Sequence, residues 1–143
     1  AVVLDQVEAT RLAALSPEQR AQTLSTQARE YLSRGLLLES ERLYQQAIAA
    51  DSRSEAAHEG LAEVRERTGD TAAARKEAEA ALQLQPTVDA YLVMARLDMA
   101  ARRLDDAARD AGEALKLSPG NKAVTEVLRE VNARQAGTSP KAP

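Results

Sequence analysis

Apolar residues recur along most of this chain at intervals of three and four positions, the spacing of one face of an α-helix. From residue 21 onward, Gly, Pro and polar residues interrupt the pattern at regular intervals, which predicts successive pairs of short amphipathic helices. In the first pair, Leu24, Ala28 and Tyr31 mark a helix that ends before Gly35, and the second helix is predicted over 39–50.

The same small or apolar residues return at equivalent positions of three successive units. Ala47, Ala81 and Ala114, for example, are separated by 34 and then 33 residues. The other recurring sets are Ala28/Ala62/Ala95, Ser40/Ala74/Ala107, Tyr44/Ala78/Ala111, Ile48/Leu82/Leu115 and Ser52/Pro86/Pro119. A fixed period in this range predicts stacked helical units rather than one globular core.

Residues 16–134 are predicted to form one repeat domain, with units at about 21–54, 55–87 and 88–121. Ser16 and Pro17 are a helix N-cap and a first helical residue, so the opening helix should begin near Pro17. The final helix, at 122–134, carries Arg129 where the units carry Ala. Its polar outer face predicts a capping helix that ends the stack.

The turns inside the units differ in one residue. Gly69 suits the left-handed conformation that ends a helix, whereas Arg102 occupies the same position in the third unit. Either Arg102 adopts a positive φ, at a cost of about 1 kcal/mol, or that turn has a different shape.

The two ends of the chain are harder to interpret. We expect residues 1–15 to form an arm or a short helix that packs on the first unit through Leu4, Val7, Leu12 and Leu15. The alternative is that Val2 to Leu4 are the end of an upstream domain. Residues 135–143, rich in Gly, Ser and Pro, are predicted to be a disordered tail.

Composition supports a helical fold and excludes several classes of function. Cys, Trp and Phe are absent, so neither disulfides nor thiolate metal sites are expected. The net charge is −3 with acids and bases interspersed, which argues against nucleic-acid binding, and no apolar run is long enough for membrane insertion. The excess of Arg over Lys and the abundant Ala favour a bacterial source, and leave cytoplasm and periplasm both open.

The recurring positions resemble the tetratricopeptide repeat, a 34-residue helix-turn-helix unit with a Trp/Leu/Gly/Tyr, Ala, Phe, Ala, Pro pattern. The resemblance covers residues 21–134. The matching positions are Leu24, Gln27, Ala28, Tyr31, Ser40, Tyr44, Ala47 and Ser52, then His58, Leu61, Ala62, Arg65, Ala74, Ala78, Ala81 and Pro86, then Tyr91, Met94, Ala95, Asp98, Ala107, Ala111, Ala114 and Pro119. The departures are Gln27, Arg65, Asp98, Arg102 and a one-residue deletion.

This resemblance implies an all-α, right-handed superhelical solenoid of three helix-turn-helix repeats with a capping helix. It also implies that the first helices line a concave groove that holds a partner peptide. The family's carboxylate clamp for acidic chaperone tails does not carry over, because its positions hold Ser25, Arg29, Gly60, Asp89 and Val93, of which only Arg29 is basic.

Two groups of residues are predicted to face the groove. Glu59, Glu63 and Glu66 share one helix face, and flanked by Arg29 and Arg96 they form an acidic strip for a ligand of basic or mixed charge. The alternative for the glutamates is a simple solvated face. The apolar residues Leu32, Leu92, Val93 and Met99 are predicted to form side-chain pockets, or else to pack against the capping helix and one another.

No catalytic, cofactor or metal site is predicted. His58, the only histidine, occupies the position of Tyr91 in the next unit and is better explained by packing than by metal binding or catalysis. We therefore expect a non-enzymatic module that binds a protein or peptide as an adaptor, assembly scaffold or chaperone. The alternatives are a self-association module that forms homo-oligomers and a regulatory appendage of a larger enzyme.

Overall fold

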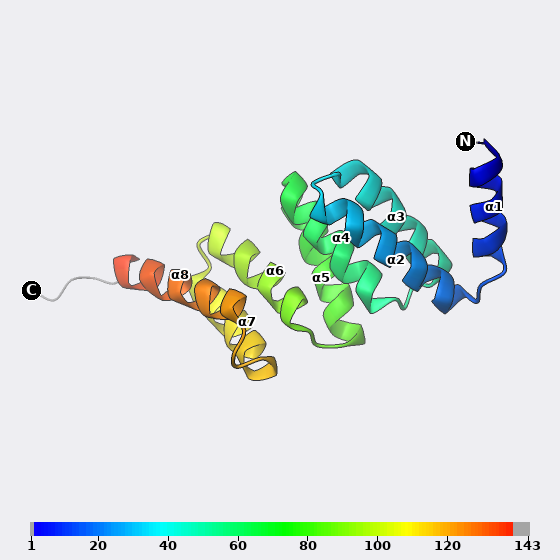
Figure 1. Ribbon diagram of the computed structural model, residues 1–143. Coiled ribbons are helices and arrows are strands. Elements are labelled where there is room, and N and C mark those ends of the chain that lie inside the picture. Colours follow the sequence, from blue (N-terminus) through cyan, green and yellow to red (C-terminus); the bar gives the residue numbers. More distant parts are fainter. Residues whose placement is uncertain (1, 139–143) are drawn as a thin grey trace, which may run out of the picture.

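Eight α-helices make up the computed structural model, which describes residues 2–138 (Figure 1). They are α1 (Val2–Ala13), α2 (Pro17–Ser33), α3 (Leu37–Ala50), α4 (Glu55–Thr68), α5 (Thr71–Leu84), α6 (Val88–Ala100), α7 (Leu104–Leu117) and α8 (Lys122–Thr138). Within residues 2–138 there is no strand, and no helix has the length and apolar character needed to cross a bilayer. The prediction of an all-α fold is confirmed.

Consecutive helices pack as hairpins, and the hairpins stack in chain order. The pairs are α2 with α3, α4 with α5, and α6 with α7, while α8 lies against α6 and α7. The first helices also touch one another, α2 with α4 and α4 with α6, whereas the second helices make no comparable contacts among the described residues. The stack therefore curves with α2, α4 and α6 on its inner side, and the predicted solenoid of three pairs and a capping helix is confirmed.

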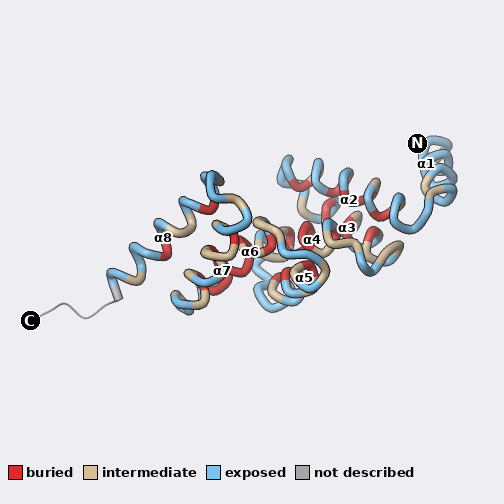
Figure 2. Tube along the Cα trace, turned by 90° about the horizontal axis from the view of Figure 1, so that it is seen from below, coloured by how far each residue is buried: buried red, intermediate tan, exposed pale blue. Residues whose placement is uncertain are grey.

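Small residues at the recurring positions allow the paired helices to approach closely. All the side chains at four equivalent positions are completely buried, namely Ala28/Ala62/Ala95, Ser40/Ala74/Ala107, Tyr44/Ala78/Ala111 and Ala47/Ala81/Ala114. In Figure 2 the buried residues accordingly lie along the facing sides of the helices. Ser40 replaces an alanine here without cost, because its Oγ donates a hydrogen bond to the carbonyl oxygen of Ala28 at 2.8 Å.

The three internal turns have the same left-handed geometry. Gly35, Gly69 and Arg102 have φ angles of 76°, 85° and 62°, so Arg102 adopts the positive φ rather than a differently shaped turn. A non-glycine residue in this region costs about 1 kcal/mol. At the opposite end of the first hairpin, the predicted N-cap is also confirmed, because Ser16 and Gln19 form a reciprocal capping box.

Ion pairs between successive hairpins account for two departures from the repeat pattern. Arg65 of α4 pairs with Glu41 of α3 at 2.8 Å, and Asp98 of α6 pairs with Arg75 of α5 at 2.6 Å. These two pairs occupy equivalent positions with the charges exchanged. If the first and third hairpins were in direct contact, Glu41 would lie opposite Asp98 and the two acids would repel each other. The exchanged charges therefore favour the observed contacts between successive hairpins.

At the N-terminal end a short helix is present as predicted, but its packing differs from the prediction. Helix α1 projects from the stack instead of lying along it: Leu4 and Val7 are 70% and 50% exposed, while Leu12 packs against the first core cluster (Figure 1). Helix α8 continues to Thr138, so residues 135–138 are helical rather than a disordered tail. The rest of the predicted tail, 139–143, lies outside the described residues.

Gly60 of α4 provides a test of the close packing. A methyl group at Gly60 would overlap the buried ring of Tyr44, which comes from the preceding hairpin. We predict that Gly60→Ala lowers the free energy of unfolding by about 1–3 kcal/mol, measured by urea denaturation followed by circular dichroism.

Gly112 of α7 is the matched control, since a methyl group there meets no atom within 4 Å. Gly112→Ala should raise stability by up to about 1 kcal/mol through helix propensity alone. Equal stabilisation by both substitutions would contradict the packing at Gly60.

Candidate functional site

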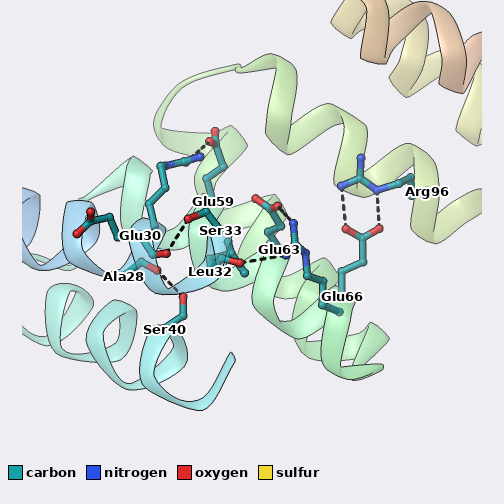
Figure 3. A network of polar contacts seen from close by, with 11 residues as sticks. Ala28, Glu30, Leu32, Ser33, Ser40, Glu59, Glu63, Glu66 and Arg96 are labelled. Atoms are coloured by element: carbon teal, nitrogen blue, oxygen red, sulfur yellow. Dashed lines mark hydrogen bonds and ion pairs between the residues drawn. The ribbon is translucent and has the colours of Figure 1, made fainter. Parts of the chain in front are cut away.

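Five of the eight predicted groove residues form one polar network on the inner side of the solenoid. Figure 3 shows this network across α2, α4 and α6. Its predicted members are Arg29, Glu59, Glu63, Glu66 and Arg96. The helix order brings them together, because α4 lies between α2 and α6 and presents its three glutamates to both neighbours.

Glu63 and Glu66 are each engaged by an arginine at close range. Arg96 of α6 donates two hydrogen bonds to the Glu66 carboxylate, at 2.7 and 2.8 Å, and these interactions raise the pKa of the guanidinium. Arg67 of α4 contacts Glu63 at 2.9 Å and also donates to the carbonyl oxygen of Leu32 in α2 at 3.2 Å. These contacts join the first helices of all three hairpins.

Glu59 has a different environment. Glu59 is 7% exposed. The hydroxyl of Thr87 donates a hydrogen bond to Glu59 Oε2 at 2.5 Å, whereas the nearest nitrogen of Arg29 is 3.7 Å from Glu59 Oε1. Burial raises the pKa of Glu59 to about 7; the Thr87 hydrogen bond opposes that shift, while Glu55 and Asp89 add to it. Glu59 therefore changes charge near neutral pH.

The glutamates do not form an uncompensated acidic strip, because arginines cover them. The side chains of Arg29, Arg67 and Arg96 are 54%, 46% and 38% exposed, compared with 9% to 24% for the three glutamates. Towards the N-terminal ends of α4 and α6, however, Glu55 is half-buried and Asp89 is exposed. The inner surface is thus basic towards the C-terminal ends of its helices and acidic towards their N-terminal ends.

The four apolar residues predicted for the groove lie in the core instead. Leu92 and Met99 are 3% and 7% exposed, because α8 covers them with Val124 and Val131. Leu32 is 3% exposed within the first core cluster. The prediction of apolar pockets at these positions is wrong, and packing against the capping helix explains Leu92 and Met99. Val93 is likewise buried.

His58 contacts both α5 and the loop that precedes α4. Its Nδ1 lies 2.6 Å from Glu77 Oε2 in α5, and its Nε2 lies 2.8 Å from the carbonyl oxygen of Ser52. With both ring nitrogens occupied, His58 has a structural role. No group of three or more His, Asp or Glu side chains within residues 2–138 is arranged to hold a metal ion.

A cleft of about 1110 Å³ lies away from this network, at the C-terminal end of the stack. The turn between α6 and α7 and the end of α8 enclose it, and Met99 is the predicted groove residue that reaches it. Its charged lining residues are Arg102, Arg103, Asp105, Asp106 and Arg134. The cleft is thus lined by charges of both signs.

Sequence reasoning missed several members of the polar network. Arg67 could have been found, since it lies four residues after Glu63 on the same helix. Thr87 could not, because it is 28 residues from Glu59 and meets it only when the hairpins stack. The contact between Tyr44 and Gly60 likewise depends on the fold.

Comparisons with known proteins agree with this architecture. Residues 25–89 match the family model for the tetratricopeptide repeat, and no curated protein matches the chain. The first such domain of Spaghetti (RPAP3), solved with the HSP90 peptide SRMEEVD, is 24% identical, with a TM-score of 0.76 over 83% of this chain and 95% of that one. The Sgt2 domain from Aspergillus fumigatus is 16% identical, with a TM-score of 0.76 and coverage of 91% of both chains. The second domain of human RPAP3, in complex with the HSP70 peptide SGPTIEEVD, is 20% identical, with a TM-score of 0.72 over 81% and 98%.

The environment of Glu59 predicts a pH-dependent contribution to stability. The pKa of Glu59 in the folded state, about 7, exceeds the ordinary value of 4.5, so the folded state binds the proton more tightly than the unfolded state does. Protonation of Glu59 therefore favours folding below about pH 4.5, and this stabilisation is lost as the pH rises through 7. Glu59→Gln should therefore raise the free energy of unfolding at pH 8 by about 1–3 kcal/mol, and the gain should shrink towards pH 4.5, as measured by urea titrations.

Glu66→Gln is the control, since it removes a carboxylate held by two hydrogen bonds from Arg96. It should lower stability at pH 8. Destabilisation of similar size by both variants would show that Glu59 is as well compensated as Glu66.

Proposed function

We propose that this chain, whose residues 25–89 match the family model for the tetratricopeptide repeat, binds a segment of another protein along the inner surface of α2, α4 and α6. The observation that carries the proposal is the exposed charged surface on these three helices, with guanidinium groups at one end and carboxylates at the other. Stacked hairpins create such an extended inner surface without enclosing a reaction site. The proposed role is an adaptor, assembly scaffold or chaperone rather than an enzyme.

The charges favour a partner segment of mixed charge. Arg67 and Arg96 can donate hydrogen bonds to carboxylates or backbone carbonyls of the segment. Each guanidinium is then shared between the segment and its own glutamate. At the other end, Glu55 and Asp89 favour basic groups. Two RPAP3 domains were solved with acidic chaperone peptides, whereas this chain has Ser25 and Asp89 at positions where the family's clamp has Lys, and Gly60 where it has Asn.

A pull-down with quantitative mass spectrometry tests the location of the binding surface. Replacing Arg29 and Arg96 with Ala should reduce recovery of the bound protein about tenfold, because both side chains lie on the inner surface. The matched control replaces Arg42 and Arg109, exposed arginines of the second helices α3 and α7. Equal recovery with both double variants, confirmed as folded by circular dichroism, would contradict an inner binding surface.

Self-association through α1 is a second candidate. Val3, Leu4 and Val7 of α1 are 72%, 70% and 50% exposed, and Val3 and Val7 line a shallow recess on that helix. Exposed apolar side chains grouped in this way are typical of interaction sites. Helix α1 is favoured over the third hairpin as the contact surface, because α8 covers the apolar residues Leu92 and Met99.

Light scattering over a range of protein concentrations distinguishes the two candidates. If copies pair through α1, the molar mass should rise with concentration, and Leu4→Glu should restore the monomer by placing a charge in the contact. A constant monomeric mass at all concentrations would eliminate self-association.

A further inference from the structure

Among the three glutamates of α4, Glu59 is the least neutralised. Glu63 and Glu66 have arginine nitrogens at 2.9 and 2.7 Å, whereas the nearest arginine nitrogen to Glu59 is 3.7 Å away. That nitrogen belongs to Arg29, whose side chain is 54% exposed and is not held by a shorter ion pair among the described residues. Arg29 can therefore leave Glu59 at little cost.

Acidic groups outnumber basic ones around this carboxylate. Glu55 lies one turn earlier on α4, close enough to hydrogen bond with Glu59, and Asp89 on α6 acts on it through space. The facing charges from the packed elements are Arg29 from α2, Glu55 and Glu63 from α4, and Asp89 from α6. Arg67 pairs with Glu63, so the carboxyl groups of Glu55, Glu59 and Asp89 are left with the single guanidinium of Arg29.

The buried hydroxyl of Tyr44 adds an independent observation. Its Oη finds no hydrogen-bond partner within residues 2–138, although the residue is completely buried. The Tyr44 ring lies against Gly60, the residue after Glu59, and its hydroxyl is close enough to Arg29, Glu63 and Glu59 for their charges to act on it. Buried polar groups are nearly always paired, so this hydroxyl indicates an incomplete site.

The cost of Glu59 to the fold also points to a binding role. A buried carboxylate with weak compensation destabilises the folded chain at neutral pH. Binding sites commonly retain such residues because a ligand supplies the missing interaction.

We propose that the N-terminal ends of α4 and α6 form a subsite for a basic side chain, Lys or Arg, of the bound partner segment. The cation lies between Glu55, Glu59 and Asp89 and takes the place of the Arg29 guanidinium. Arg29 then turns towards the segment, and the hydroxyl of Tyr44 is free to join the rearranged network. This inference rests on the proposed function, since it assigns the chemistry of one position in the segment.

The subsite couples binding to proton release. A cation favours the ionised form of Glu59, so a protonated Glu59 gives up its proton when the basic side chain enters. Affinity for basic segments should therefore fall as the solution is acidified through neutral pH.

Peptide libraries test the subsite directly. The immobilised full chain is incubated with short mixed peptides in which one position is fixed as Lys, Arg, Glu or Ala, and the retained peptides are quantified. The wild type should retain Lys- or Arg-fixed peptides about tenfold more than Glu-fixed ones at pH 8. The double variant Glu59→Gln with Asp89→Asn should lose most of this preference, and the wild-type preference should decline between about pH 8 and about pH 5.5.

The control removes two acids from the second helices, with Glu39→Gln and Glu79→Gln, and should keep the wild-type preference. Preference for Glu-fixed peptides, or an undiminished basic preference in the double variant, would overturn the subsite. Peptides that bind the inner surface without charge preference refute the subsite alone. If replacing Arg29 and Arg96 leaves all peptide retention unchanged, the proposed function itself fails.

Discussion

Close approach of helices at small residues is the constraint on which this structure depends. The twelve residues at the four equivalent positions are completely buried, and eleven of them are Ala or Ser. With so few large side chains, the hairpins gain stability by bringing backbones together rather than by filling a wide core. The exception, Tyr44, is accommodated because Gly60 on the next hairpin has no side chain.

Charged residues then stabilise the contacts between successive hairpins. The pairs Glu41–Arg65 and Arg75–Asp98 lie at equivalent positions with the acid and the base exchanged, so each hairpin complements its neighbour. On the inner side, Arg96–Glu66 forms a further ion pair between α6 and α4. Glu59 is the position of this network where pairing is poor, and it lies where the inner surface has acidic neighbours rather than basic ones. Helix α4 therefore carries both the ion pairs that join the hairpins and the carboxylate proposed for binding.

Local chemistry made much of this fold predictable. The capping box at Ser16, the turn at Gly69 and the recurring alanines depend on residues close in sequence, so the hairpins and their period could be predicted. The burial of Leu92 and Met99 could not, because it depends on where α8 lies after the last turn.

The site was predictable only as a set of charged positions. The three glutamates share a helix face by their spacing alone, which placed them on the inner surface. Their partners come from other hairpins, as Thr87 and Arg96 do, and these determine which carboxylate is neutralised. The difference between Glu59 and Glu66 is therefore a property of the stacked structure.

Amide chemical-shift mapping of the nitrogen-15-labelled chain, titrated with a retained peptide, tests the central claim most directly. If the inner surface holds the partner segment, the largest shifts should fall on α2, α4 and α6, centred on Arg29, Glu59 and Asp89. Shifts confined to α1 or to the second helices α3, α5 and α7, with those three residues unchanged, would contradict the account.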